Sequence, residues 1–260
     1  MSEIEIGIIG GTRGMGKWFA DFLRGEGYTV HVSGRTAGMG LAEMAQTCQV
    51  VVVSVPIGAT GEIISRIGPL MKKEALLMDL TSVKQGPVQL MMEHSASEVI
   101  GCHPLFGPQI LSPEGNHVVL CPARTGQWLP WLKGLLEKNN LLVVETTPEK
   151  HDAMMAVVQG LNHMNTIVMG MALAKTGIDL SALDGFVTPL FAEKMKLIRK
   201  IFNDNPRLYA EIITMNPDVR EMFRLYEESL AELTGVIKCG DTDGLAAIMD
   251  TYAARLWPPS

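Results

Sequence analysis

The chain contains 260 residues, of which 22 are Lys or Arg and 28 are Asp or Glu, so its formal net charge is −6. This acidic balance argues against a general polyanion-binding protein, and we expect no nucleic-acid partner. The hydrophobic fraction of 47% and the charged fraction of 19% exclude a disordered chain, because this composition can form a buried core. At this length we expect two domains.

Four cysteines are spread over the chain without a CxxC pair, and we expect them to be small buried hydrophobic residues. Apolar, periodic sequence begins within a few residues of Met1, so we expect no secretory leader and a cytoplasmic location. We predict no metal site. The cysteines are Cys48, Cys102, Cys121 and Cys239.

The first half of the chain alternates short β-branched runs with amphipathic stretches. The runs are continuously apolar, which is typical of strands in a sheet that is covered on both faces. Residues 16–25, between the first two runs, carry apolar side chains at helical spacing. This pattern predicts an α/β fold with a doubly wound, Rossmann-type parallel sheet. The predicted strands are 4–9, 28–33, 50–55, 75–80, 99–102 and 118–121.

A Gly-rich turn separates the first predicted strand from the first predicted helix. Its glycines let the backbone approach a pyrophosphate, whose charge lies against the free N–H groups of the helix end. When G-x-G-x-x-G is aligned on this turn, Arg13 occupies the middle glycine position, so we expect the phosphates to be held slightly differently. The alternative is a tight turn that binds nothing. The predicted cofactor contacts are Gly10, Gly11, Thr12, Arg13, Gly14, Met15 and Gly16.

The end of the second predicted strand lacks the acidic residue that binds the ribose hydroxyls of NAD in this fold. Ser33, Arg35 and Thr36 instead offer donors that suit a 2′-phosphate, and Arg35 or Arg13 could bind it bidentately. We therefore predict NADP in preference to NAD. The alternative is that Arg35 is only a solvated surface charge, in which case the cofactor preference stays open. After the third predicted strand, Ser54, Val55 and Pro56 are expected to lie beside the nicotinamide.

A later predicted strand ends in Gly101-Cys-His103-Pro, at the edge where open α/β sheets place their ligands. A neutral imidazole beside a hydride acceptor can take the proton from a substrate hydroxyl, and we predict this catalytic role for His103. A structural histidine is the alternative. Ser82, in the loop after the fourth predicted strand, is predicted to orient this ring or the substrate, or else to cap a helix.

From about Thr147 onward the strand pattern vanishes, and Gly and Pro divide the region into five or six helical segments. We therefore predict domains at 1–147 and 148–260. Residues 153–174 lack charged side chains over almost the length of a membrane span. Their polar groups would be poorly satisfied in lipid, so we predict no membrane contact and a buried helix, covered by other helices or by a second subunit.

Six segments in order resemble the prephenate dehydrogenase family of tyrosine biosynthesis, and they span nearly the whole chain. Each is weak alone, but their succession is specific. The three most informative are Asp79-Leu-Thr-Ser82-Val-Lys84, Gly101-Cys-His103-Pro-Leu-Phe106-Gly-Pro108, and His151-Asp152 followed by Gln159-Gly-Leu-Asn-His163. The others are Val53-Ser-Val-Pro56, Thr188-Pro189-Leu and residues 202–213.

This resemblance implies an oxidative decarboxylation. Prephenate would give its ring C4 hydride to the nicotinamide, lose CO2 and become 4-hydroxyphenylpyruvate, while His103 draws away the hydroxyl proton. Loss of CO2 then follows from aromatisation. By spacing from Thr188-Pro189, Lys200 stands where related enzymes place an Arg that binds a substrate carboxylate, and Arg199 precedes it. We predict that either cation binds the substrate, with a solvated surface charge as the alternative for both.

Asp152, Gln159 and His163 would project within about 20 degrees of one line on a regular α-helix. A polar stripe on an otherwise apolar helix indicates a pocket, and we predict that Gln159 and His163 bind substrate. A buried hydrogen-bond network between helices is the alternative. The helical half is rich in Met, and its apolar face spans residues 154–171. A domain of about 110 residues cannot bury this face by itself, so we expect a homodimer.

Three other functions remain open at this stage. Arogenate, with an amine in place of the side-chain ketone, could be the substrate, because the catalytic step is unchanged. A different NADP oxidoreductase, such as a β-hydroxyacid dehydrogenase, would use a Lys in the helical region and leave His103 idle. A non-catalytic NADP-binding redox sensor would need the Gly-rich loop but no histidine at the hydride site.

Overall fold

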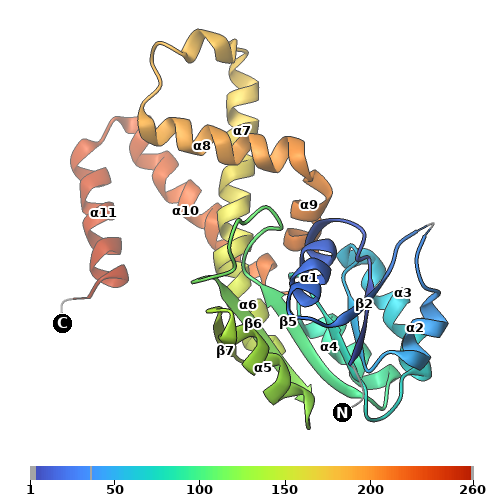
Figure 1. Cartoon of the computed structure of the whole chain (residues 1–260). Helices are drawn as coiled ribbons and strands as arrows, with labels where there is room; N and C mark the ends of the chain where they lie inside the picture. The colour runs from blue at the N-terminus through green and yellow to red at the C-terminus, as the bar shows by residue number, and fades with distance from the viewer. Residues whose placement is uncertain (1–3, 36, 259–260) are drawn as a thin grey trace.

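The structure, a computed structural model of the chain, describes residues 4–35 and 37–258. Seven strands form one sheet in the order β2-β1-β3-β4-β5-β6-β7 (Figure 1). Strands β1 to β5 are parallel, β6 pairs antiparallel with β5, and β7 pairs parallel with β6. The bounds are β1 Glu5–Ile9, β2 Thr29–Ser33, β3 Val50–Val53, β4 Leu76–Asp79, β5 Glu98–Pro104, β6 His117–Arg124 and β7 Leu142–Glu145.

All six predicted strands are present, and the predicted Rossmann-type α/β class is confirmed. The predicted parallel arrangement does not extend to β6, which pairs antiparallel with β5. Residues 105–116, which connect β5 to β6, contain no helix, whereas a parallel return needs a long crossover that is usually helical. The strand β7 was not predicted, although its Leu-Val-Val run is as apolar as those of the predicted strands; it lies at an edge and exposes Leu142 and Val144 by 48% and 44%.

Helices cover both faces of the sheet, which makes it doubly wound. On one face, Phe19 and Leu23 of α1 pack with side chains of α5 and the strands. On the other face, Met44 of α2, Ile64 of α3 and Met91 of α4 form a second cluster. Strand side chains enter both clusters, which explains their continuously apolar sequences. The bounds are α1 Gly14–Gly25, α2 Leu41–Thr47, α3 Ile57–Ile67 followed by a 3₁₀ turn Gly68–Leu70, α4 Gln85–His94 and α5 Trp128–Lys138.

The strand order reverses beside β1, because the chain places β2 on one side of it and β3 to β5 on the other. Open α/β sheets bind ligands at such a reversal, outside the carboxyl ends of the strands. Gly10 follows β1 and Ser54 follows β3 at this edge. The strand β5 extends past its last pairing with β4, at Gly101, and carries His103 at the same edge.

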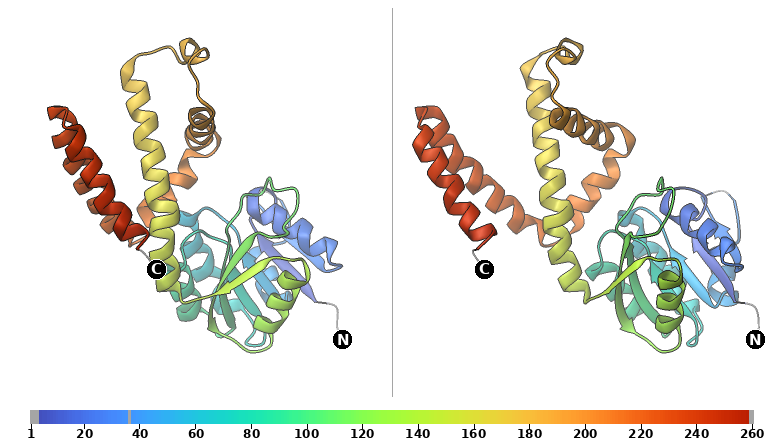
Figure 2. Two further views of the ribbon diagram at one scale, coloured as in Figure 1. Left: turned by 90° about the vertical axis from the view of Figure 1, so that its left-hand side faces the viewer. Right: turned by 60° about the vertical axis from the view of Figure 1, so that its left-hand side comes forward.

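The second half of the described chain contains six α-helices, as predicted, and no strand. It extends away from the sheet domain, and α10 and α11 diverge from α7 (Figures 1 and 2). We keep the junction between β7 and α6, at 147/148, as our proposed domain boundary. The bounds are α6 Pro148–Met155, a π-helical segment Ala156–Leu161, α7 Asn162–Thr176, a 3₁₀ turn Leu180–Leu183, α8 Pro189–Arg199, a second π-helical segment Lys200–Asp204, α9 Pro206–Met215, α10 Val219–Cys239 and α11 Thr242–Leu256.

Three of these helices begin in the same way. Each has Pro at its first position, where the missing N–H costs no hydrogen bond. The preceding side chains of Thr147, Thr188 and Asn205 accept the N–H groups of Lys150, Phe191 and Leu208 at 3.2, 3.3 and 3.2 Å. These caps fix where α6, α8 and α9 start.

The uncharged stretch 153–174 is less buried than predicted. Within α7 only Met164 and Gly170 are buried, while Val168 and Met171 are exposed by 38% and 47%. The expectation that other helices of the same chain cover it is therefore wrong, and cover by a second subunit stays a prediction. Among the described residues, no helix combines the length and the apolar character that crossing a membrane requires.

Candidate active site

The Gly-rich segment forms the turn between β1 and α1. Gly10 has φ +84°, and a Cβ there would lie 2.0 Å from the carbonyl oxygen of Ser54. A Cβ on Gly16 would lie 2.6 Å from the carbonyl oxygen of Gly10. These close approaches require glycine at both positions. They hold the first turn of α1 against β1 and β3, which is the cradle that a pyrophosphate needs at a helix N-terminus.

The loop has no side chain that occupies the start of α1. Arg13 is the N-cap residue and makes no side-chain capping hydrogen bond, and Thr12, Arg13 and Gly14 are exposed. Gly11 is buried against Val32, where a Cβ would lie 2.8 Å from a methyl carbon, and Met15 is half-buried. The predicted loop residues fit a dinucleotide phosphate.

The turn after β2 lies against this loop. A Cβ on Gly34 would lie 2.9 Å from the methyl carbon of Thr12. Ser33, the last residue of β2, is buried, and Arg35 is exposed beside it. Thr36 lies outside the described residues. Ser54 and Val55 are partly exposed, and Pro56 precedes the first turn of α3. The predicted cofactor residues that the structure describes therefore belong to three neighbouring loops at one edge of the sheet.

His103 lies near the end of β5 and is only 3% exposed. Its Nδ1 lies 2.9 Å from Nε2 of His151, the fourth residue of α6. Burial is the main cause that holds the pKa of His103 well below its ordinary value of 6.5. The ring is thus neutral at physiological pH, the state that a proton acceptor requires.

His151 hydrogen-bonds in turn to its neighbour Asp152, with 2.7 Å between Nδ1 and Oδ1. The carboxylate of Asp152 also accepts the backbone N–H groups of Lys84 and Gln85, at 2.8 and 2.9 Å. These are the free N–H groups at the start of α4, where a negative charge is favoured. A side chain of the helical half therefore caps a helix of the sheet domain. Sequence analysis placed Asp152 in a polar stripe but did not identify this contact.

Ser82 is half-buried, and its side chain makes no hydrogen bond to another described residue. The alternative that it caps a helix is wrong, because α4 begins at Gln85 with Lys84 at its N-cap. The partner of His103 Nδ1 is His151, so Ser82 does not hold that nitrogen. A contact between the free hydroxyl of Ser82 and substrate stays a prediction.

A buried ion pair that the sequence analysis missed lies beneath the site. Lys84 and Asp79 are both 0% exposed, and Lys84 Nζ donates to Asp79 Oδ2 and, at 3.0 Å, to the carbonyl oxygen of Cys102. Asp79 Oδ2 also accepts the N–H of Thr81 at 3.0 Å. Its other oxygen, Oδ1, is buried without a partner among the described residues. The pair ties β4 to β5 directly before His103.

The predicted substrate residues of the helical half lie on or beside the π-helical segments. Gln159 belongs to the first segment and Lys200 to the second, and π-helical turns occur frequently at functional sites. The ring of His163 packs edge-on against Tyr209 at 4.9 Å between centroids. Burial, followed by the charge of Lys200, lowers the pKa of His163. Arg199 ends α8 and is exposed, like Lys200.

The predicted polar stripe does not follow α-helical geometry. Residues 156–161 form a π-helical segment, so the angular spacing assumed between Asp152 and Gln159 does not apply. Asp152 binds the start of α4, whereas His163 contacts Tyr209 of α9. Gln159 Oε1 is buried without a partner among the described residues. Gln159 thus has an unused acceptor, and Asp152 serves the domain junction instead.

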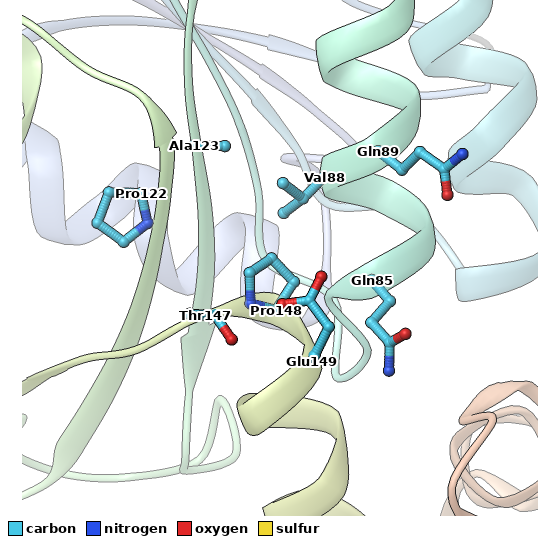
Figure 3. A pocket seen from close by; sticks show the side chains of 8 residues that line it. All are labelled: Gln85, Val88, Gln89, Pro122, Ala123, Thr147, Pro148 and Glu149. Carbon is cyan, nitrogen blue, oxygen red and sulfur yellow. The ribbon is translucent and has the colours of Figure 1, made fainter.

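Two surface hollows lie near these residues, and the second is lined in part by Gly14 of the Gly-rich turn. One, of about 410 Å³, is bounded by α4, β6 and the start of α6, with Val88, Pro122 and Pro148 around it (Figure 3). The other, of about 550 Å³, lies along α1 beside Trp18 and Pro108. Neither is lined by His103, which is consistent with its burial.

This combination of a Rossmann-type domain, a helical domain and a buried imidazole near the carboxyl end of β5 defines the two-domain dehydrogenase architecture. Residues 35–145 match the family model of the prephenate dehydrogenase nucleotide-binding domain, and residues 147–251 match that of the prephenate dehydrogenase dimerization domain. The chain therefore belongs to the prephenate dehydrogenase family, which confirms the resemblance inferred from its sequence.

Three known proteins illustrate the relationship. A probable arogenate/prephenate dehydrogenase of Methanocaldococcus jannaschii is 33% identical over 97% of this chain and 61% of its own length. The T-protein of Haemophilus influenzae is 31% identical over 95% of this chain and 67% of its own length. The chain thus spans about two thirds or less of these relatives. The crystal structure of prephenate dehydrogenase from A. aeolicus, with hydroxyphenyl propionate and NAD+, superposes with a TM-score of 0.70 at 21% identity, covering 98% of both chains.

Breaking the buried ion pair between Lys84 and Asp79 should destabilise the protein. Lys84→Met should lower the free energy of unfolding by roughly 3–5 kcal/mol, because it leaves the Asp79 carboxylate buried and uncompensated. Adding Asp79→Asn should recover part of the loss. Lys17→Met, which removes the exposed i,i+4 partner of Asp21, is the matched control and should change little. Urea unfolding measures all three, and equal losses in Lys84→Met and Lys17→Met would contradict the prediction.

Proposed function

We propose that the chain is a prephenate dehydrogenase, which oxidises prephenate to 4-hydroxyphenylpyruvate and CO2 with hydride transfer to NADP. Membership of the family supports this proposal. The observation that carries it is the neutral, buried imidazole of His103 at the edge of the sheet that also holds the Gly-rich loop. A cofactor cradle and a proton acceptor at one edge are what oxidation of a carbinol needs.

The chemistry assigns a distinct task to His103. Removing hydride from C4 of prephenate is easier when the C4 hydroxyl loses its proton, and His103 accepts that proton. The nicotinamide, when bound, accepts the hydride. The carboxylate at C1 then leaves as CO2, and its bonding electrons complete the aromatic ring. Ser82, with an unused hydroxyl near the start of α4, is proposed to contact the substrate.

The two carboxylates of prephenate need local cations, since the protein is acidic overall. Lys200 lies close enough to His163 to lower the pKa of that imidazole. We propose that Lys200, Gln159 and His163 bind one end of the substrate, with Arg199 as the second candidate cation. Lys presents a point charge rather than the bidentate fork of Arg, so the carboxylate would be held in a less fixed orientation.

Arogenate is the second candidate substrate. The relative from M. jannaschii is named for both arogenate and prephenate. The step at C4 is identical, so only groups near the side chain distinguish the two compounds. We rank prephenate first, because Lys200 favours a side chain that bears a carboxylate without a neighbouring ammonium group.

The helical half is proposed to form a homodimer. It exposes many apolar side chains, among them Phe186 in the turn before α8, and Leu190, Phe202 and Ile237 on its helical segments. Surfaces of this kind on a single chain usually mark an interface. The matching family model is that of a dimerization domain. The cysteines are free in the described chain, which suits the reducing cytoplasm that we propose as its location.

The enzymatic proposal is tested by mixing the protein with NADP and prephenate and following absorbance at 340 nm, with arogenate and NAD in parallel.

His103→Asn should lower kcat by about a hundredfold or more and leave NADP affinity unchanged, because only the base is lost. The acidic limb of kcat/KM should lie below pH 6.5, since a lowered pKa keeps His103 neutral until the pH falls through it. No reaction with either substrate would favour the sensor, and equal damage to NADP affinity would make His103 structural.

The cofactor preference depends on the turn after β2. Arg35→Asp should shift the ratio of kcat/KM values from NADP toward NAD, because it replaces the proposed partner of the 2′-phosphate with a carboxylate. Arg66→Asp makes the same charge change on the exposed last turn of α3 and is the control. An unchanged NADP to NAD ratio in Arg35→Asp would remove the argument for NADP.

The homodimer is tested by analytical ultracentrifugation at micromolar concentration. We expect a dimer, because the exposed apolar faces of α7, α8 and α10 then become buried. Replacing the exposed Phe186 and Leu190 with Glu should shift the protein toward monomer. A wild-type protein that sediments as a monomer would refute the assembly.

A further inference from the structure

Three ionisable groups form a line that runs from the centre of the candidate site to the start of α4. His103 comes from β5, whereas His151 and Asp152 come from α6 of the helical half. All three are buried, with exposed fractions of 3%, 2% and 0%. The two rings meet edge-on at 66°, so the ring nitrogens face each other without stacking.

The direction of each hydrogen bond follows from the donors around Asp152. The N–H groups of Lys84 and Gln85 can only donate, and they engage both oxygens of Asp152. An ionised carboxylate accepts hydrogen bonds and donates none, so Nδ1 of His151 must carry a proton. In a neutral ring, Nε2 of His151 is then an acceptor. With His151 neutral, the contact at 2.9 Å has His103 donating from Nδ1.

We propose that His151 and Asp152 are a positioning pair, which holds His103 in the tautomer with its proton on Nδ1 and its lone pair on Nε2. This inference rests on the proposed function, because it assigns Nε2 as the atom that receives the substrate proton. Without the pair, neutral histidine can place its proton on either nitrogen. The Nε2–H tautomer would present a donor to the substrate hydroxyl and could not accept its proton.

The proton balance of the proposed reaction closes on this arrangement. The C4 hydroxyl gives its proton to Nε2 of His103 as the C4 hydride leaves. The resulting imidazolium keeps its Nδ1–H bond to His151, whose Nδ1–H remains bonded to the charged Asp152. After the C1–carboxylate bond breaks and the ring becomes aromatic, the phenolate oxygen takes the proton back from Nε2. His103 thus returns to its starting tautomer, and no proton has to pass through His151.

The pair is itself held by the junction of the two domains. Asp152 is fixed at the N-terminus of α4, whose partial positive charge offsets its own. The side chain of Asn216, next to α9, donates to the carbonyl oxygen of Asp152 at 2.9 Å. The orientation of the proposed base on one domain is therefore set by two residues of the other domain.

The test compares three variants in which folding is checked by the thermal unfolding midpoint. His151→Leu fills similar space but removes the acceptor for His103. His151→Gln can still place an amide oxygen within reach of His103 Nδ1. His31→Leu removes a different imidazole–carboxylate contact, the 3.2 Å pair with Glu5, and is the matched control outside the site.

The first readout is the tautomer of His103, from the ¹⁵N chemical shifts of the free protein labelled in its histidine rings. We expect the Nδ1–H form in wild type, His31→Leu and His151→Gln, and a shift toward Nε2–H in His151→Leu. An Nε2–H form in wild type, or an unchanged Nδ1–H form in His151→Leu, would overturn the proposal. This readout needs no substrate, so it holds even if the dehydrogenase assignment fails.

The second readout separates kcat from KM. His151→Leu should lower kcat by at least about tenfold, but less than His103→Asn, with KM for the substrate nearly unchanged. His151→Gln should restore most of the loss. If His151 had only a structural role, His151→Leu would instead lower the unfolding midpoint, and His151→Gln would restore neither the tautomer of His103 nor kcat. Wild-type kcat in His151→Leu would overturn the proposal, whereas inactivity of the wild type with both substrates would overturn the proposed function alone.

Discussion

The contact between Asp152 and the start of α4 is the interaction on which the arrangement of the site depends. The carboxylate of Asp152 accepts two backbone N–H groups that have no partner within the helix, and it also accepts a hydrogen bond from His151. A buried carboxylate without such donors would be strongly unfavourable. The same negative charge therefore satisfies a helix end, joins the two domains and orients a ring beside the proposed base.

A second carboxylate of the helical half acts in a similar way. Glu211 of α9 is buried and accepts the N–H of Ile57, the first residue of α3, at 3.0 Å, while its other oxygen accepts from Arg207 at 2.6 Å. Both contacts use acidic side chains of the helical half at helix N-termini of the sheet domain. Because those helices start at the carboxyl edge of the sheet, the domains meet beside the cofactor loop and His103.

The sequence predicted those features that depend on local pattern. The strands β1, β3, β4 and β5 were recognisable because their side chains enter the apolar clusters on both faces of the sheet. The antiparallel strand β6 was foreseeable from residues 105–116, which contain Gly and Pro but no helical periodicity. The two π-helical segments carry no signal that pattern analysis detects.

The long-range contacts of the site were beyond sequence reasoning. Lys84 reads as a charged loop residue, and only the fold places it, fully buried, against Asp79. His151 lies 48 residues from its partner, and the adjacent Asp was the sole sign that its ring is held. Predicting hydrogen bonds between domains requires knowing how the domains meet, which no single-sequence periodicity contains.

The indirect placement of Asp152 has an electrostatic consequence. A carboxylate bonded directly to His103 would stabilise its protonated form and raise its pKa, whereas the His151 ring between them leaves burial as the main influence, which lowers that pKa. Neutralisation by α4 also reduces the repulsion that Asp152 would exert on a substrate with two carboxylates. Orientation is thereby obtained without placing an unpaired negative charge in the site. In an acidic protein that is proposed to bind a dianion, this separation of orientation from charge suits the buried His103 to its proposed role as a base.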